Sequence, residues 1–233
     1  MRRHANLLFV IAVFFTCVVI GQECDTYLLL KEGTSLEYTN YDRKGKAITI
    51  GTHKAAKVTS SNGKFESNIT LDVKDLKKGD TFTMEYDVSC EDGVLSIDMS
   101  RFFDSSQLMQ YEGADFDIDI QGDMLYFPRD LVEGADLNDG NITIKVAKDG
   151  FTFVTMTMTI FNRKVLGKES ITTDAGTFEC QKVTFDFESK FGIIKVRGSA
   201  IEWYHDNRII VKSESYNKKG KLLGSTKLTA MTE

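Results

Sequence analysis

The dominant pattern along this chain is an alternation of apolar and polar residues with a period of two. It is clearest over residues 65–74 (FESNITLDVK) and 81–90 (TFTMEYDVSC), where every second side chain is apolar or small. A period of two turns one set of side chains to a core and the other to solvent, which predicts half-buried antiparallel strands. Further strands are predicted over 34–41, 47–58, 94–99, 115–120, 142–146, 151–161, 165–172, 178–188, 193–205, 209–216 and 222–230.

One segment breaks the alternation. Between Ser100 and Tyr111 the apolar residues fall near helical spacing, and Ser100 or Asp104 can cap the first turn, which predicts one short amphipathic helix. A lone helix in a β-rich chain has to lay its apolar face on the sheet, for example across the mouth of a barrel. The predicted fold class is therefore mainly β: a single antiparallel curved sheet or half-open barrel of about a dozen strands, with one short helix packed on it.

The predicted strand from Phe151 to Phe161 (FTFVTMTMTIF) carries no charged residue on either face. Such a strand is buried on both sides in a core, or it has one face in the core and the other lining an apolar cavity. The second interpretation makes the large apolar side chains of this strand, of the predicted helix and of the single tryptophan the candidate ligand-binding residues. They are Phe102, Phe103, Met109, Phe151, Phe153, Met156, Met158 and Trp203.

The acidic run 115–120 (DFDIDI) has the carboxylates that a calcium site would need. The calcium-loop pattern requires Gly at its sixth position, where Ile120 stands, and its carboxylates do not normally alternate with large apolar residues. A strand with a solvated carboxylate face explains the run better. No metal and no cofactor are predicted.

Composition and the N-terminus narrow the class of protein. A chain of 233 residues with 42% hydrophobic residues suits one domain, and a net charge of −5 argues against a nucleic-acid partner, which requires a basic stripe. Arg2 and Arg3 precede an apolar run over 7–20, which predicts a signal peptide over residues 1–21 and a single β-rich domain over 22–233. Glu23 stands where a lipoprotein signal would place a small residue before Cys24.

Three cysteines remain beyond the predicted signal peptide: Cys24, Cys90 and Cys180. In the oxidising compartment that export implies, the simplest arrangement is one disulfide and one free thiol. The sequence leaves all three pairings open.

Several segments together resemble a known family. They are residues 172–183 (TTDAGTFECQKV), 202–204 (EWY), 210–216 (IVKSESY), 30–38 (LKEGTSLEY) with Cys24, and 90–93 (CEDG) followed by 97–99 (IDM). This set resembles the TapB-like family of secreted bacterial proteins, a domain-of-unknown-function family. The chain departs from that pattern at Asp174, where the family usually has Pro, and over 205–208, where it has Gly-rich residues.

The resemblance implies a fold and a compartment but no activity. The family is similar in architecture to half-open barrels of lipid and lipoprotein carriers, which hold acyl chains against a curved sheet beneath a helix. It implies an exported protein of the cell envelope, in the periplasm, associated with the outer membrane, or extracellular.

Three functions are compatible with these residues. The first is a non-catalytic binding protein with an apolar cavity for a lipid or another hydrophobic small molecule. The second is a structural or assembly protein with a solid core that contacts another envelope protein through its sheet edges or its basic turns over 43–46 and 218–221. A cavity of several hundred Å³ would separate the first from the second.

The third is a hydrolase using a carboxylate pair, Asp117 with Asp119 or Glu202 with Asp206. The chain has no GxSxG, HExxH or phosphate-binding Gly-rich motif, so no enzyme is predicted.

Overall fold

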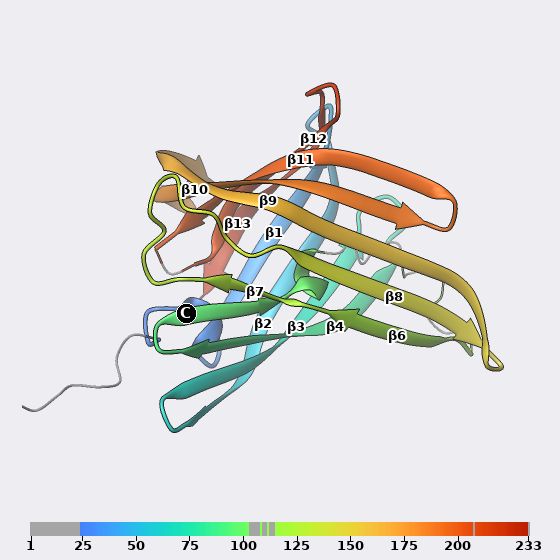
Figure 1. Ribbon diagram of the computed structural model, residues 1–233, viewed down its shortest axis with the longest axis horizontal. Helices are drawn as coiled ribbons and strands as arrows, with labels where there is room; N and C mark the ends of the chain where they lie inside the picture. Colours follow the sequence, from blue (N-terminus) through green and yellow to red (C-terminus); the bar gives the residue numbers. More distant parts are fainter. Residues whose placement is uncertain (1–23, 103–107, 109–110, 112–114, 207, 233) are drawn as a thin grey trace, which may run out of the picture.

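The computed structural model describes residues 24–102, 108, 111, 115–206 and 208–232 (Figure 1). In these residues thirteen antiparallel strands form one sheet in the order β6-β8-β9-β10-β11-β12-β13-β1-β2-β3-β4-β5-β7. The predicted fold class, a mainly β, barrel-like antiparallel sheet of about a dozen strands, is confirmed. The strands are β1 (Ser35–Asp42), β2 (Ala47–Ser61), β3 (Lys64–Asp75), β4 (Thr81–Glu91), β5 (Val94–Asp98), β6 (Asp117–Gly122), β7 (Met124–Phe127), β8 (Gly140–Lys148), β9 (Phe151–Thr173), β10 (Gly176–Phe191), β11 (Ile194–His205), β12 (Ile210–Asn217) and β13 (Leu222–Thr232).

Helical structure is scarce in the described part of the chain. It contains two 3₁₀ turns, η1 (Leu28–Leu30) and η2 (Met99–Phe102). The range predicted to be a helix, 100–111, overlaps η2, where the Asp98 carboxylate accepts a hydrogen bond of 2.7 Å from the Ser100 N–H. Residues 103–107 and 109–110, among them Phe103 and Met109, lie outside the described residues. No helix within the described ranges is long and apolar enough to cross a membrane.

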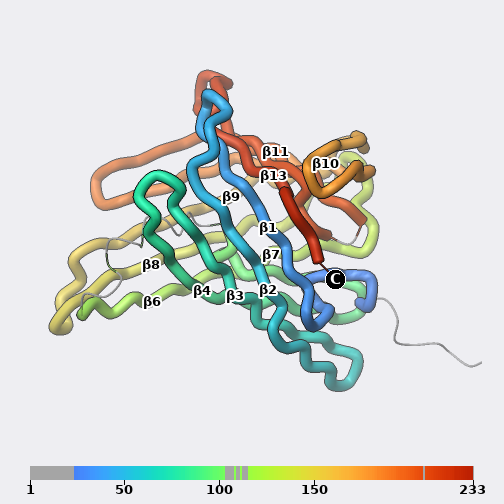
Figure 2. Tube along the Cα trace, turned by 180° about the vertical axis from the view of Figure 1, so that it is seen from behind, coloured from blue at the N-terminus to red at the C-terminus, as the bar shows by residue number. Residues whose placement is uncertain are grey.

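Strands β6 and β7 link the two edges of the sheet. They are joined by the single residue Asp123, yet β6 pairs with β8 and β7 pairs with β5. The Asp123 N–H donates to the Asn141 carbonyl at 2.9 Å, the Asp123 carboxylate accepts from the Asn141 N–H at 2.8 Å, and the Asp123 carbonyl accepts from the Met99 N–H at 3.0 Å. The extended segment 117–127 therefore curls the sheet into a nearly closed barrel (Figure 2).

A polar seam fills the remaining gap between β7 and β9. The Asn138 side chain donates to the Met124 carbonyl at 2.9 Å and accepts from the Tyr126 N–H at 2.8 Å, so that it continues the ladder of β7. The Arg163 guanidinium on β9 donates to the Asn138 carbonyl at 2.8 Å and is only 2% exposed. Its charge-assisted hydrogen bonds join the seam to β9.

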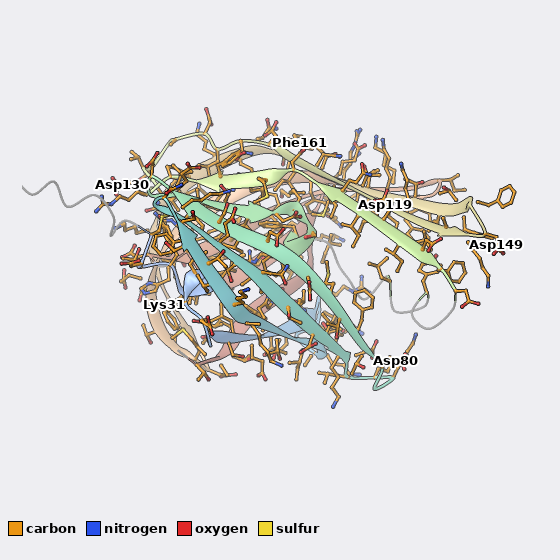
Figure 3. All side chains as sticks on the ribbon, turned by 90° about the horizontal axis from the view of Figure 1, so that it is seen from below. Lys31, Asp80, Asp119, Asp130, Asp149 and Phe161 are labelled. Carbon is orange, nitrogen blue, oxygen red and sulfur yellow. A yellow bond between two sulfur atoms is a disulfide. The ribbon has the colours of Figure 1, made fainter. Side chains whose placement is uncertain are left out.

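The two ends of the barrel differ. At the first, called the closed end, Leu28, Leu29 and Leu30 of η1 are buried, and a disulfide joins Cys24 to Cys90 with 5.8 Å between their Cα atoms. Cys180 is a buried free thiol. The second, called the open end, carries the five hairpin turns over 42–47, 75–81, 148–151, 191–194 and 217–222. Figure 3 shows Lys31 and Asp130 near the closed end and Asp80 and Asp149 at the open end.

The uncharged strand extends past its neighbour at the open end. The pairing of β9 with β10 stops at Met156 and Phe191, so residues 151–155 have a strand partner only in β8. Phe151 is consequently 75% exposed and Phe153 is 65% exposed, whereas Met156 is buried. The absence of charged residues over 151–161 predicted that both faces of this strand are buried. The prediction is wrong for Phe151 and Phe153, because β10 does not extend far enough to pair with this part of β9.

Candidate binding cavity

A cavity of about 500 Å³ lies inside the barrel, between β1–β3 on one side and β9–β13 on the other. Its volume falls within the range of about 300–1,000 Å³ that is typical of small-molecule sites. Its apolar wall is formed by Ile48, Leu71, Val73, Phe102, Met158, Phe185, Phe187, Ala200, Ile210 and Leu223.

Small residues keep the space open. The period of two turns Gly51 of β2, Ala200 of β11, and Ser213 and Ser215 of β12 toward the interior, where all four line the cavity. Short side chains at facing positions cannot meet across the barrel, so a void remains between them.

The inner end of the cavity is polar. Arg101 of η2, Glu202 of β11, His53 of β2 and Tyr38 of β1 all line it. His53 Nδ1 lies 2.9 Å from the hydroxyl oxygen of Tyr86, and the Tyr38 ring packs edge-on against the imidazole with 5.1 Å between centroids. The Nε atom of Arg101 is buried and has no hydrogen-bond partner in the part of the chain that the structure describes.

Burial determines the charge state of these groups. Burial, and next the charge of Arg101, lowers the pKa of His53 to about 3, so the imidazole is neutral at physiological pH. Burial raises the pKa of Tyr38 to about 12 and also raises the pKa of Glu202 above its ordinary value. Arg101 is the one Lys or Arg among the described residues that line the cavity, and a guanidinium stays protonated.

The structure separates the predicted ligand-binding residues. Phe102 and Met158 line the cavity, and the Phe102 ring packs edge-on against Phe185 with 6.5 Å between centroids. Met156 is buried in the core, and neither it nor the exposed Phe151 and Phe153 is among the lining residues.

Trp203 does not line the cavity either. Because its neighbour Glu202 points inward, alternation turns Trp203 to the outer face of β11. There its indole N–H donates to the Glu169 carboxylate at 3.0 Å, and the Lys212 ammonium lies 4.5 Å from the ring centroid. These contacts cover the tryptophan without placing it in a ligand site.

Sequence reasoning missed the polar inner end. A usable clue lies in β11, where Ala200, Glu202 and Tyr204 share the inward face, so a carboxylate interrupts an otherwise uncharged row. The Tyr204 hydroxyl donates to the Glu202 carboxylate. A charged residue on the buried face of a strand requires partners, and its presence indicates a polar site within the core.

The carboxylate pairs considered for catalysis lie elsewhere. Asp117 and Asp119 are exposed on the edge strand β6, and Asp206 is exposed beyond the end of β11 while Glu202 faces the cavity. Among the described residues no group of three or more His, Cys, Asp or Glu side chains is placed to hold a metal ion.

A nearly closed antiparallel barrel around an internal cavity defines the class of fold. Within that class, the chain belongs to the DUF3108-like family, whose family model matches residues 31–228. The name TapB is not confirmed by the comparisons. No curated protein matches the chain.

Two solved structures are similar to this one. A proposed exported protein of Bacteroides fragilis NCTC 9343 with a YmcC-like fold has a TM-score of 0.74 at 23% sequence identity, covering 87% of this chain and 97% of that one. A proposed lipoprotein of Parabacteroides distasonis ATCC 8503 has a TM-score of 0.75 at 21% identity, covering 89% of this chain and 98% of that one. At this level of identity the likeness concerns the fold.

Proposed function

We propose that this protein is an exported, non-catalytic binding protein of the cell envelope that holds a single-chain amphiphile with an acidic head group. The observation that carries the proposal is a cavity with apolar walls and a buried guanidinium at its inner end. Export is supported by the signal peptide predicted over residues 1–21 and by the Cys24–Cys90 disulfide, because such bonds persist in oxidising compartments.

The walls suit an acyl chain. Leu71, Val73, Phe185 and Phe187 offer apolar surface from opposite sides of the barrel, and each Å² of ligand surface that they cover contributes about 25 cal/mol. Met158 adds a flexible side chain that adapts to an irregular apolar ligand. A structural protein with a solid core has no use for this space.

The inner end suits an acidic head group. A guanidinium binds a carboxylate or phosphate through charge-assisted hydrogen bonds. The Arg101 guanidinium interacts with the hydroxyls of Tyr38 and Tyr86, and its Nε has no hydrogen-bond partner among the described residues. The nearby Glu202 carboxylate would repel an anion, but its raised pKa reduces the cost of protonating it when a ligand arrives. Tyr38 also lines this end, and its hydroxyl can donate to the head group.

The first experiment identifies the ligand. The protein is produced with its own leader, recovered as the host exports it, and extracted with organic solvent. Mass spectrometry of the extract should then find a single-chain lipid in near-stoichiometric amount. The stripped protein is next titrated with a fluorescent fatty acid. Failure to carry lipid and to rebind the fatty acid would together overturn the proposal.

A wall variant locates the site. Ser213→Phe places a large ring in the cavity and should abolish fatty-acid binding. Thr52→Phe is the matched control, since Thr52 lies on β2 between the cavity-lining Gly51 and His53 and therefore faces outward. The melting temperatures and circular dichroism spectra of both variants should match, which shows that both are folded before their fatty-acid binding is compared. Full binding by a folded Ser213→Phe protein would contradict the assignment.

A head-group variant tests Arg101. Arg101→Met keeps the length of the side chain and removes its charge, so it should weaken binding of a fatty acid by about 10- to 100-fold, the value of charge-assisted hydrogen bonds. Binding of the fatty alcohol with the same chain should change little. Equal losses for acid and alcohol would indicate a purely structural role for Arg101.

A further inference from the structure

The hairpin turns of the open end are strongly basic, although the protein as a whole carries a net charge of −5. Nine Lys and Arg but only four Asp fall within the five turns 42–47, 75–81, 148–151, 191–194 and 217–222. The neighbouring start of β6 adds two acidic residues, Asp115 and Asp117. The cations that flank the turn 191–194 are paired with the Glu188 carboxylate, so the positive charge is concentrated on 42–47 and 217–222.

The closed end has the opposite balance. Its connecting segments over 24–34, 61–64, 91–94, 127–139 and 205–209 hold nine Asp and Glu and four Lys and Arg. The barrel is therefore electrically polarised along its length, with the open end positive. A polarised charge distribution orients a protein before it touches a charged surface.

The same turns expose large apolar side chains. Ile193 is fully exposed, Phe151 is 75% exposed and Ile194 is 61% exposed. Eight of the ten exposed large hydrophobic side chains in the described residues lie at this end, and Val132 is the one that lies in a closed-end loop. Figure 3 shows the turn that carries Asp149, two residues before Phe151, at the extreme of the molecule.

We propose that the open end docks onto a membrane surface that carries anionic head groups. Lysine and arginine side chains attract such a surface, and each contributes on the order of 1 kcal/mol near it. Exposed aromatic and aliphatic side chains at the tips then enter the boundary between head groups and acyl chains. The opposite sign of the two ends means that only the open end is attracted.

The composition favours a lipid surface over a protein partner. Lysine is depleted in protein–protein interfaces, whereas here a lysine stands among the exposed apolar residues, as Lys195 does between Ile194 and Val196 at the start of β11. The exposed apolar residues also belong to different turns, and these turns are separate from one another (Figures 1 and 2). Separate tips can enter a fluid head-group layer independently.

Docking would direct the cavity toward the membrane. Ile48 and Leu223, both exposed, line the part of the cavity nearest to the turns 42–47 and 217–222. A ligand could then move between bilayer and barrel without crossing much water. Docking requires only the charges and the exposed side chains of the open end, whether or not the cavity carries a ligand.

The test is co-sedimentation of the exported protein with vesicles of phosphatidylcholine alone or of phosphatidylcholine mixed with phosphatidylglycerol. The protein should bind the mixed vesicles and should be released by salt, because exposed charges are screened. Lys218→Gln, Lys219→Gln and Lys221→Gln together should lower partitioning at least about tenfold. The matched control neutralises Lys31, Lys57 and Lys64 toward the closed end and should leave partitioning unchanged.

A second pair of variants tests insertion of the tips. Phe151→Ser with Ile193→Ser should weaken binding to the mixed vesicles several-fold, whereas Val132→Ser at the closed end should not. Equal binding to neutral vesicles, no binding to either, or equal losses in the open-end and closed-end variants would overturn the inference. Fatty-acid binding by the same proteins in the absence of vesicles separates a failure of docking from a failure of the cavity.

Discussion

Removal of the disulfide should destabilise the protein substantially. Cys24 precedes η1, whose three leucines are buried at the closed end, and Cys90 ends the inward face of β4. The bond therefore fixes the start of the described chain to the sheet. The perturbation is the double variant Cys24→Ala, Cys90→Ala, since alanine leaves no polar group in these buried positions.

The magnitude follows from the length of the loop that the bond closes. The two cysteines are 66 residues apart. The chain-entropy relation for a loop of this length gives about 4 kcal/mol, within the range of about 2–5 kcal/mol for removal of native disulfides. For a protein of this size each kcal/mol lowers the melting temperature by about 2–4 °C, so a fall of about 8–16 °C is expected.

The assay is urea unfolding followed by circular dichroism. The double variant should match the wild-type protein measured in the presence of a reducing agent. Cys180→Ala is the control, because this buried thiol forms no disulfide and its loss removes only one buried atom. A loss of unfolding free energy below about 1 kcal/mol in the double variant would refute the entropic argument.

Three further perturbations test other parts of the account. Arg163→Met removes the hydrogen bonds from β9 to Asn138 and should cost about 2–4 kcal/mol in urea unfolding; an unchanged midpoint would show that the seam does not hold the barrel. Gly198→Ala places a Cβ 2.0 Å from the Tyr216 carbonyl and should destabilise by about 1–3 kcal/mol or more, whereas Gly167→Ala, whose nearest contact would be 3.5 Å, should cost far less. His53 has a pKa lowered to about 3, so the unfolded chain binds the extra proton first and stability falls as the pH drops below about 6.5. Between pH 7 and pH 5 this loss is about 2 kcal/mol, and equal losses in wild type and His53→Gln would contradict the assignment.

The strands could be predicted because alternation reports which face of each strand is buried. In β4 every second residue is buried from Phe82 to Cys90, as the pattern indicated. The pattern also predicted two strands over 151–161 and 165–172, whereas β9 is continuous. The interruption is at Asn162, which adopts a φ of 55° next to the register shift between β9 and β10. Such a bulge breaks the period of two without ending the strand.

The closure of the barrel and the polar site could not be predicted in the same way. Alternation specifies faces but not neighbours, and the pairing of β6 with β8 and of β7 with β5 depends on contacts distant in sequence. Arg101 belonged to a segment whose spacing indicated a helix, so nothing in the sequence placed it beside Glu202. The cavity is lined by small residues of different strands, such as Gly51 of β2 and Ala200 of β11, which come together only after folding.

A crystal structure of the exported protein soaked or copurified with a fatty acid tests the central claim most directly. We expect continuous density for one acyl chain between Leu71 and Phe185, with the acid group within hydrogen-bond distance of the Arg101 guanidinium. A cavity filled by ordered water or by side chains that have moved inward, in a protein that also fails to bind the fatty acid in solution, would contradict it.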